Sequence, residues 1–204
     1  MGAFLMRVLV ACEFSGRVRD AFIRRGHDAW SCDVIGTDCS GPHIKGSALD
    51  VLDRGWDLMV AHPPCTYLCS MGIWWNHKRP ERWQHTYNAR DFAEALWDAP
   101  IEKICIENPP GYLTNNSNLG KPAQCVQPWH HGHEANKPTS LWLKNLPKLK
   151  KTKVVDKGRF YVKANGHRMS AWSHTTSGTS KAKRSKIAST TFEGIAGAMA
   201  GQWG

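Results

Sequence analysis

The stretch "MRVLVACEFSGRVRDAFIRRG", residues 6–26, decides the fold class. Its beginning, residues 6–12, is a short continuous apolar run, typical of a strand that is buried on both faces of a parallel sheet. A turn at residues 13–16 ends this run, and apolar residues then follow at helical spacing as far as Gly26. A buried strand that passes directly into a helix predicts the first half of a β-α-β unit.

The same rhythm continues along the chain. We expect further strands at residues 27–34, 56–62 and 103–108, and a final helix that begins near Phe192 and packs on the main body. Strands that alternate with helices predict an α/β fold with a mostly parallel, doubly wound sheet. In such sheets the functional loops lie at the carboxyl ends of the strands.

One helix can be predicted in more detail. Over residues 81–98 the helical spacing directs Tyr87, Phe92, Ala95 and Leu96 toward a core. In contrast, residues 35–46 show no periodic pattern and are expected to form a loop.

Composition narrows the class of protein. The chain has 204 residues, of which 41% are hydrophobic, so we expect one globular domain with a real core. The net charge of +10 favours a polyanionic partner such as nucleic acid, although a generic basic protein is the simpler explanation. Seven cysteines without regular spacing favour a reducing compartment, the cytoplasm. No apolar run approaches the ~20 residues of a membrane span, and the N-terminus lacks the pattern of a signal peptide.

The second half of the chain contains a basic segment. We expect residues 1–143 and 184–204 to form the main domain, with residues 144–183 as a small basic insertion. Its cations and those just after it are candidates to contact nucleic-acid phosphates, although a solvated positive face is an equally good explanation for any one of them. These candidates are Arg159, Lys163, Arg168, Lys181, Lys183 and Arg184.

The turn "EFSG", residues 13–16, is a candidate binding corner. A strand, a turn of small residues and a helix can hold a nucleotide or an adenosyl group, but the turn has only one glycine and an ordinary strand-to-helix turn explains it as well. Asp33, at the end of the second strand, is placed to accept hydrogen bonds from ribose hydroxyls, or it is simply a loop acid. Asp50 is a candidate for an adenine amino group, or for the cap of a turn.

The stretch "VAHPPCTYLCS", residues 60–70, contains the most informative residue. Cys65 follows two prolines at the end of a strand, where burial in the core is less natural than for most single cysteines. A thiolate in this place can act as a nucleophile. Zinc binding is the rival interpretation, with Cys69 and the histidines of "HHGH" (130–133) as further ligands, but C-x3-C without a second pair is a poor zinc signature. We therefore expect no metal.

A second candidate, Glu107, stands in "ICIENPPGYL" (104–113). A glutamate at the end of an apolar strand is costly to bury unless it is paired or has a chemical task. Together with a cysteine on a neighbouring strand, it suggests nucleophilic attack combined with proton delivery.

These motifs resemble the cytosine-5 DNA methyltransferases, in particular their small, phage-type members. "HPPCTYLCS" is similar to the Pro-Cys nucleophile loop of that family, and "ENPP" to its Glu-Asn motif. "ACEFSG" occupies the position of the Phe-x-Gly cofactor turn, and "TTFEGIAGAMAGQW" resembles the closing helix. "GHEANKPTSLWLKNLP" is similar to the segment that carries a basic residue, with Lys137 where the family usually has arginine. The motifs follow the family's order and span nearly the whole chain.

The resemblance implies a Rossmann-like fold that binds S-adenosylmethionine (SAM), with a small recognition segment. The catalytic residues that it implies are Cys65, Glu107 and Lys137. The residues that it implies for the cofactor site are Glu13, Phe14, Ser15, Gly16, Asp33, Asp50 and Pro64. The implied activity is methylation of cytosine C5 in double-stranded DNA by a cytoplasmic protein, which we expect to be a monomer.

The implied mechanism is a covalent one. The Cys65 thiolate adds to C6 of a base flipped out of the duplex, which makes C5 nucleophilic. Three alternatives stay open: a catalytically silent nucleic-acid-binding homologue, transfer of another one-carbon group or action on RNA, and methylation of an exocyclic amine. The last is suggested by the Asn-Pro-Pro at residues 108–110, although Gly111 separates it from the aromatic Tyr112.

Overall fold

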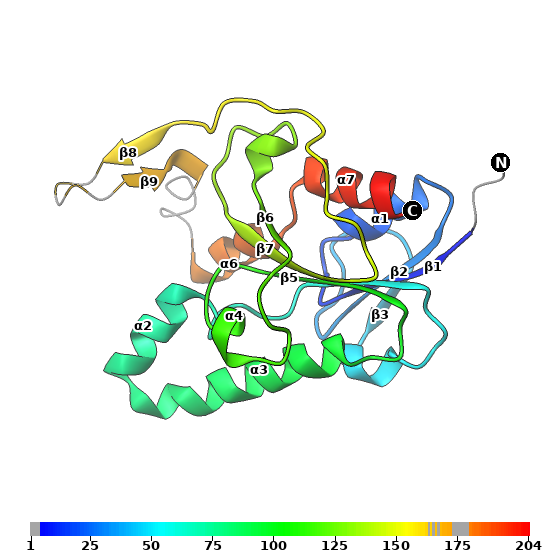
Figure 1. Cartoon of the computed structure of the whole chain (residues 1–204), viewed down its shortest axis with the longest axis horizontal. Coiled ribbons are helices and arrows are strands. Elements are labelled where there is room, and N and C mark those ends of the chain that lie inside the picture. The colour runs from blue at the N-terminus through cyan, green and yellow to red at the C-terminus, as the bar shows by residue number, and fades with distance from the viewer. Residues whose placement is uncertain (1–4, 163, 165, 167, 173–179) are drawn as a thin grey trace.

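The computed structural model describes residues 5–162, 164, 166, 168–172 and 180–204. A seven-stranded sheet crosses the molecule, with α1 (Arg17–Ile23) and α7 (Glu193–Trp203) on one face and α3 (Trp83–Trp97) on the other (Figure 1). Two additional strands form a small hairpin at one end of the longest axis.

The remaining elements have the following bounds. The strands of the main sheet are β1 (Arg7–Ala11), β2 (Asp28–Asp33), β3 (His43–Lys45), β4 (Leu58–Ala61), β5 (Lys103–Asn108), β6 (Gln124–Val126) and β7 (Thr139–Lys144). The hairpin consists of β8 (Phe160–Val162) and β9 (Arg168–Ser170). The other α-helices are α2 (Ser70–Lys78), α4 (Leu113–Asn116) and α6 (Lys181–Ser189), and the short 3-10 helices are η1 (Ala48–Val51), η2 (Pro80–Arg82) and η3 (Pro128–His130).

The sheet has the strand order β3-β2-β1-β4-β5-β7-β6. Strands β1 to β5 are parallel to one another, and β7 runs antiparallel to both β5 and β6. The chain first winds outward from β1 to β3, then returns to the other side of β1 and continues through β4 and β5. This reversal creates a topological switch point between β1 and β4, the place where doubly wound sheets bind ligands. The predicted α/β, mostly parallel, Rossmann-like fold is confirmed.

The core has two layers, because alternate side chains of a strand point to opposite faces of the sheet. Val8 and Val10 of β1 pack with α1 and α7, whereas Leu9 and Ala11 pack with the cluster that contains Leu96 of α3. These four side chains are fully buried, and only Arg7, at the start of β1, is exposed. The continuous apolar run that opened the sequence therefore reflects a strand covered on both faces.

Two local predictions are wrong. Residues 35–46 contain the edge strand β3, which pairs in parallel with β2 through only three residues, too few to leave a periodic pattern. In α3, Tyr87 and Ala95 are exposed. The buried stripe of this helix is turned toward Thr86, whose hydroxyl hydrogen-bonds Asn76 and the Tyr67 carbonyl, so a polar residue occupies a place where the pattern requires an apolar one.

The basic segment between β7 and α6 contains the β8–β9 hairpin, and α6 spans residue 184, the expected boundary of this segment. No helix in the described part of the chain is long and apolar enough to cross a membrane. All seven cysteines belong to described residues and are unpaired.

Candidate active site

The candidate site lies at the carboxyl ends of the parallel strands. Cα pairing places Ala11 of β1 opposite both Cys32 of β2 and Ala61 of β4, and Ala61 opposite Ile106 of β5. The residues that follow these positions therefore emerge at one edge of the sheet. This juxtaposition was the main structural expectation from the sequence, because each unusual polar residue follows one of these strand ends.

A cavity of about 540 Å³ opens at this edge. Four of the predicted site residues line it: Phe14, Asp33, Pro64 and Cys65. Sequence reasoning missed its other lining residues, which are Cys12, Cys32, Val34, Ile35, Gly46, Ser47, Ala48, His62, Thr66, Phe92, Ser185, Lys186, Ala188 and Ser189. Its volume is within the ~300–1,000 Å³ of typical sites for small ligands and cofactors.

Glu13 is not among the residues that line the cavity. It is buried, and its carboxylate accepts hydrogen bonds from the backbone N–H of Val18 (2.8 Å) and of Arg19 (3.2 Å) and from the Ser15 hydroxyl (3.3 Å). A carboxylate that accepts amide hydrogens in the first turn of a helix is a capping group. The geometry thus gives Glu13 and Ser15 a structural task at the start of α1.

Gly16 also supports this turn and lies outside the cavity lining. Its φ of 69° is in the left-handed region, and a Cβ atom built there would be 2.4 Å from Nη2 of the fully buried Arg19. The Arg19 guanidinium donates hydrogen bonds to the Ser40 carbonyl (2.7 Å) and to the Ser31 hydroxyl (3.1 Å). Gly16 therefore leaves space for the arginine that ties α1 to the loop after β2.

The two predicted aspartates have different environments. Asp33 is half-buried, lines the cavity and accepts a hydrogen bond from the Ile35 N–H at 3.2 Å through one carboxylate oxygen. Asp50 is exposed on η1, outside the cavity lining. Asp33 is thus the acid that faces the cavity, and it stands where doubly wound sheets place a ribose partner.

Hydrogen bonds from Asn108 and from the backbone hold the Cys65 loop in place. The buried Asn108 side chain donates from Nδ2 to the Pro63 carbonyl at 2.8 Å, which joins the ends of β5 and β4. The Cys65 carbonyl then accepts hydrogen bonds from the Leu68 and Cys69 N–H groups, both at 3.0 Å. The asparagine of the Asn-Pro-Pro sequence therefore stabilises the cysteine loop, because its side-chain N–H donates to the loop backbone.

Cys65, Glu107 and Lys137 lie close enough for their charges to act on one another. Burial is the largest influence on the thiol and, with the neighbouring Cys69 and Glu107, raises the pKa of Cys65 to about 11. The Lys137 ammonium and a backbone hydrogen bond act in the opposite direction. The structure thus brings together the three predicted catalytic residues, from the ends of β4 and β5 and from the segment before β7.

Glu107 has a partner that sequence reasoning missed, His62. Its Oε2 lies 3.4 Å from the His62 Nδ1, and both side chains are largely buried. Burial alone would raise the pKa of Glu107, but the hydrogen bond from His62, the charges of His62 and Lys137, and the Thr139 hydroxyl outweigh it and lower the pKa. Glu107 is therefore held as a carboxylate. The only sequence signal for His62 was its place directly before the two prolines.

Two buried polar atoms beside this cluster have no hydrogen-bond partner within the described part of the protein. They are the Nε2 of His62 and the Oδ1 of Asn108. Buried polar groups are almost always paired, so each of these two atoms is available to a water molecule or to a ligand at the cavity. His62 is one of the residues that line the cavity.

Lys137 and α6 are connected. The Lys137 ammonium donates a hydrogen bond to the Ala188 carbonyl at 2.6 Å and lies 5.6 Å from the centre of the Trp172 ring. Two residues earlier on α6, Lys186 pairs with Asp38 at 2.9 Å and lies 5.3 Å from the centre of the Phe14 ring. Both lysines thus hold α6 against the cavity, a packing that no local pattern in this basic stretch predicts.

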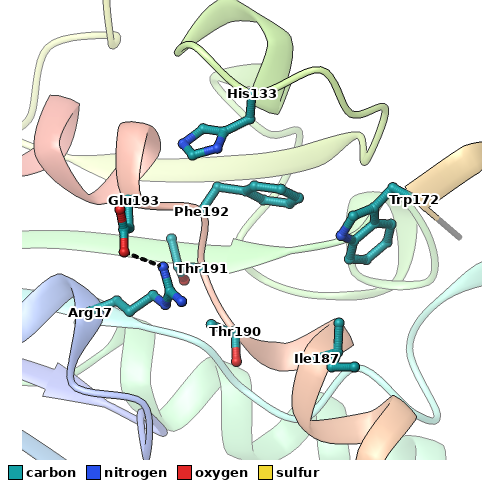
Figure 2. Close-up of a pocket in the computed structure, with 8 residues that line it drawn as sticks. All are labelled: Arg17, His133, Trp172, Ile187, Thr190, Thr191, Phe192 and Glu193. Atoms are coloured by element: carbon teal, nitrogen blue, oxygen red, sulfur yellow. Dashed lines mark hydrogen bonds and ion pairs between the residues drawn. The ribbon is translucent and has the colours of Figure 1, made fainter. Parts of the chain in front are cut away.

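A second cavity, of about 380 Å³, lies where α6 passes into α7. Figure 2 shows its lining, with the ion pair between Arg17 and Glu193 (2.7 Å) on one side and Trp172 on the other. His133 also lines it, and its Nε2 accepts the Gly194 N–H at 2.9 Å. Helix α6 contributes residues to both cavities.

The predicted nucleic-acid contacts that belong to the described residues lie just before β8, on β9 and on α6. Arg159, Arg168, Lys183 and Arg184 are exposed, and the Arg168 guanidinium lies over the Phe160 ring. Lys163 and the side chain of Lys181 lie outside the described residues.

The histidine-rich stretch shows no metal centre. His131 hydrogen-bonds the Thr152 hydroxyl at 3.0 Å, and His133 accepts from the backbone of α7. Within residues 5–162 and the described positions after them, no group of three or more His, Cys, Asp or Glu side chains is arranged to hold a metal ion.

The chain is similar in fold to proteins of known structure. The chain matches no family model and no curated protein. It is similar to a prophage-encoded E. coli protein that bears the name of a DNA modification methyltransferase, with a TM-score of 0.49, 12% identity and 74% of this chain covered. It is also similar to the Entamoeba histolytica methyltransferase EhMeth, with a TM-score of 0.47, 13% identity and 75% covered. The chain spans 52% and 58% of the lengths of these two proteins.

Proposed function

We propose that the protein is a SAM-dependent DNA methyltransferase that methylates C5 of cytosine through a covalent adduct between Cys65 and C6. One observation carries the proposal: a cysteine on the cavity wall lies beside a carboxylate and a lysine, all at the switch point of a doubly wound sheet. The motif resemblance is consistent with this arrangement and implies a reaction that Cys65, Glu107 and Lys137 can perform together.

The residues around the larger cavity fit an adenosyl cofactor. Asp33 would accept hydrogen bonds from its ribose hydroxyls, and the Phe14 ring would pack against it. The His62 Nε2, which has no partner in the described part of the chain, supplies a buried polar contact at the wall of this cavity. When bound, the cofactor supplies an electrophilic methyl group.

The protein's own residues perform the remaining steps. The Cys65 thiolate adds to C6 of the flipped cytosine, and the electron pair of the C5–C6 double bond becomes available at C5. The Glu107 carboxylate, which is hydrogen-bonded to His62, accepts a hydrogen bond from the exocyclic amine of the cytosine and, once N3 has gained a proton from solvent as charge develops on the ring, a second one from N3–H. Lys137 supplies positive charge near the sulfur. After C5 has gained the methyl group, transfer of the C5 proton to water restores the C5–C6 double bond and expels the Cys65 thiolate, and N3 returns its proton to solvent.

Methylation of an exocyclic amine is the less favourable alternative. The enzymes of that class carry an Asp/Asn-Pro-Pro-aromatic motif, whereas here Gly111 separates the prolines from Tyr112. Asn108 is also outside the cavity lining. Cys65, in contrast, lines the cavity.

A covalent trap tests the proposal. The parent protein, with SAM and duplex DNA that contains 5-fluorocytosine, is expected to form an adduct that survives denaturation and maps by mass spectrometry to Cys65, because fluorine at C5 cannot leave as a proton does. Cys65→Ser should form no adduct. Cys69→Ser, four residues away on the same loop, is the matched control and should still form it.

Other results would contradict the proposal. Recovery of the labelled methyl group as N4-methylcytosine or N6-methyladenine would show that the protein methylates an exocyclic amine and not C5. DNA binding without methyl transfer in the parent would identify a catalytically silent homologue, and methyl transfer to RNA alone would change the polymer.

A further inference from the structure

Several large apolar side chains are exposed on α2, and Tyr87 of α3 is exposed as well. Met71 is 65% exposed, Trp74 is 50%, Trp75 is 42% and Tyr87 is 39%. Single exposed apolar residues are normal, but a group of large aromatics on one surface marks an interaction site. Trp74 and Trp75 contact each other edge to face, with ring centres 4.8 Å apart, so the two rings form a preformed corner.

Cations accompany these rings. Lys78 lies over Trp74 (5.9 Å from the ring centre), and Arg79 lies over Trp75 (5.4 Å). Residues 70–90 contain four Lys or Arg and a single acid, Glu81. An apolar patch that binds protein usually has few lysines at its centre. Flat rings interleaved with positive charge instead suit a chain of stacked bases joined by phosphates.

This surface is built directly on the nucleophile loop. Cys69, whose N–H donates to the Cys65 carbonyl, is the residue that precedes the first turn of α2. At Gly72, a Cβ atom would stand 2.3 Å from the Thr66 carbonyl oxygen, so the helix touches the loop backbone without a side chain between them. The position of Cys65 and that of α2 are therefore coupled.

A buried polar network fixes the orientation of α2. The Asn76 side chain donates to the Thr86 hydroxyl at 2.7 Å, which donates in turn to the Tyr67 carbonyl at 3.1 Å. Arg82 donates to the Asn76 side-chain oxygen at 3.3 Å and lies over the Tyr67 ring. This network connects α2, α3 and the nucleophile loop, and it leaves both Trp74 and Trp75 facing outward.

We propose that α2 is a stacking platform for DNA bases at the opened site. Trp74 and Trp75 would stack on bases that lose a neighbour when the target nucleotide leaves the helix, while Lys78 and Arg79 bind the adjacent phosphates. The proposal rests on the proposed function for the identity of the polymer. Figure 1 places α2 at the same end of the longest axis as the β8–β9 hairpin, so DNA held there meets basic residues from two separate parts of the chain.

Equilibrium binding without cofactor tests the platform. The probes are a fluorescein-labelled duplex with one abasic site, the same duplex fully paired, and the single strand. Trp74→Ala and Trp75→Ala are each expected to weaken binding to the abasic duplex and the single strand by about 5-fold to 150-fold, the range of one lost stacking contact. Binding to the fully paired duplex should change less, because its bases remain stacked on one another.

Conservative and matched controls sharpen the result. Trp74→Phe keeps an aromatic face and should retain most of the affinity. Arg79→Ala should weaken all three complexes and reduce the slope of log affinity against log salt by about 1. Two variants outside α2 serve as controls. Leu5→Ala changes an exposed apolar residue before β1, and Arg24→Ala changes an exposed cation directly after α1. Neither variant should affect binding.

Two outcomes would overturn the platform. In one, the folded Trp74→Ala and Trp75→Ala proteins bind every probe as the parent does. In the other, the parent self-associates through this surface and the same variants abolish only the association. Because DNA binding is measured without methyl transfer, a parent that binds through these tryptophans but never methylates DNA would overturn the proposed function and leave the platform intact.

Discussion

At the scale of single residues, Cys65 experiences opposing influences. Burial and negative neighbours raise the pKa of its thiol to about 11, whereas Lys137 lowers it. At neutral pH the free protein therefore holds a protonated thiol, and a proton must leave before the sulfur can attack. A nucleophile that is masked until substrate arrives is protected from oxidation and alkylation.

The alkylation rate of Cys65 reports this pKa. Since the reactive species is the thiolate, the rate of carboxamidomethylation of the Cys65 peptide should rise about tenfold per pH unit between pH 7 and pH 10. Lys137→Ala removes a positive charge, raises the pKa further and should slow the reaction at each pH, whereas Lys137→Arg should react much as the parent does. Peptide mapping by mass spectrometry separates Cys65 from the other six cysteines. A rate that is already independent of pH near 7 would contradict the masked thiol.

At the scale of elements, α1 begins at a buried carboxylate. Glu13→Ala removes the acceptor of the Val18 and Arg19 N–H groups and leaves both buried and unsatisfied. The expected cost is about 1–3 kcal/mol, which corresponds to a fall of roughly 2–10 °C in Tm for a chain of this length. Thermal unfolding followed by circular dichroism measures it.

Two further results decide between the roles of Glu13. Ser15→Ala removes only a hydroxyl that bonds Glu13 at 3.3 Å, and it should lower Tm little. If Glu13→Ala instead keeps the parent's Tm but loses SAM affinity, as measured by calorimetry, then Glu13 is a cofactor residue and its capping role is secondary.

Whether a strand or helix could be predicted from the sequence depended on how that element is buried. Strands β1, β4 and β5 could be predicted because a strand covered on both faces has a continuous apolar centre, and β2 could be predicted from its place after the first helix in the β-α-β rhythm. The strand ends then located Asp33, Cys65 and Glu107. Helix α2 gave no pattern, since it buries only Gly72 and Asn76 and turns its tryptophans outward. The packing of α6 beside the cavity depends on contacts of Lys186 with Asp38 and Phe14, about 150 and 170 residues away in sequence, which no local spacing encodes.

At the scale of the whole molecule, the residues behind the net charge of +10 are unevenly distributed over the surface. Exposed cations lie on the β8–β9 hairpin, on α6 and on α2, around the edge of the sheet where Cys65 emerges. The sequence alone predicted the charge and the hairpin residues. It did not predict the contribution of α2, because that contribution depends on how the helix is oriented.

Salt dependence tests this arrangement. DNA affinity should fall as salt rises, and each cation removed from a phosphate contact should reduce the slope of log affinity against log salt by about 0.9. The double variant Lys183→Ala/Arg184→Ala should therefore reduce it by roughly 2. Arg24→Ala is the matched control. An unchanged slope in the double variant would place the DNA away from α6.

Helix α6 has a consequence for how the two ligands of the proposed reaction communicate. The helix that presents Lys183 and Arg184 to solvent also presents Lys186 and Ser189 to the cavity. Thermodynamic linkage is symmetric. If binding of the methyl donor changes the affinity for DNA through this helix by some factor, binding of DNA must change the affinity for the methyl donor by the same factor. A short basic helix shared by both sites thereby couples the two affinities in the proposed reaction, and the demethylated donor would compete for that coupling after every turnover.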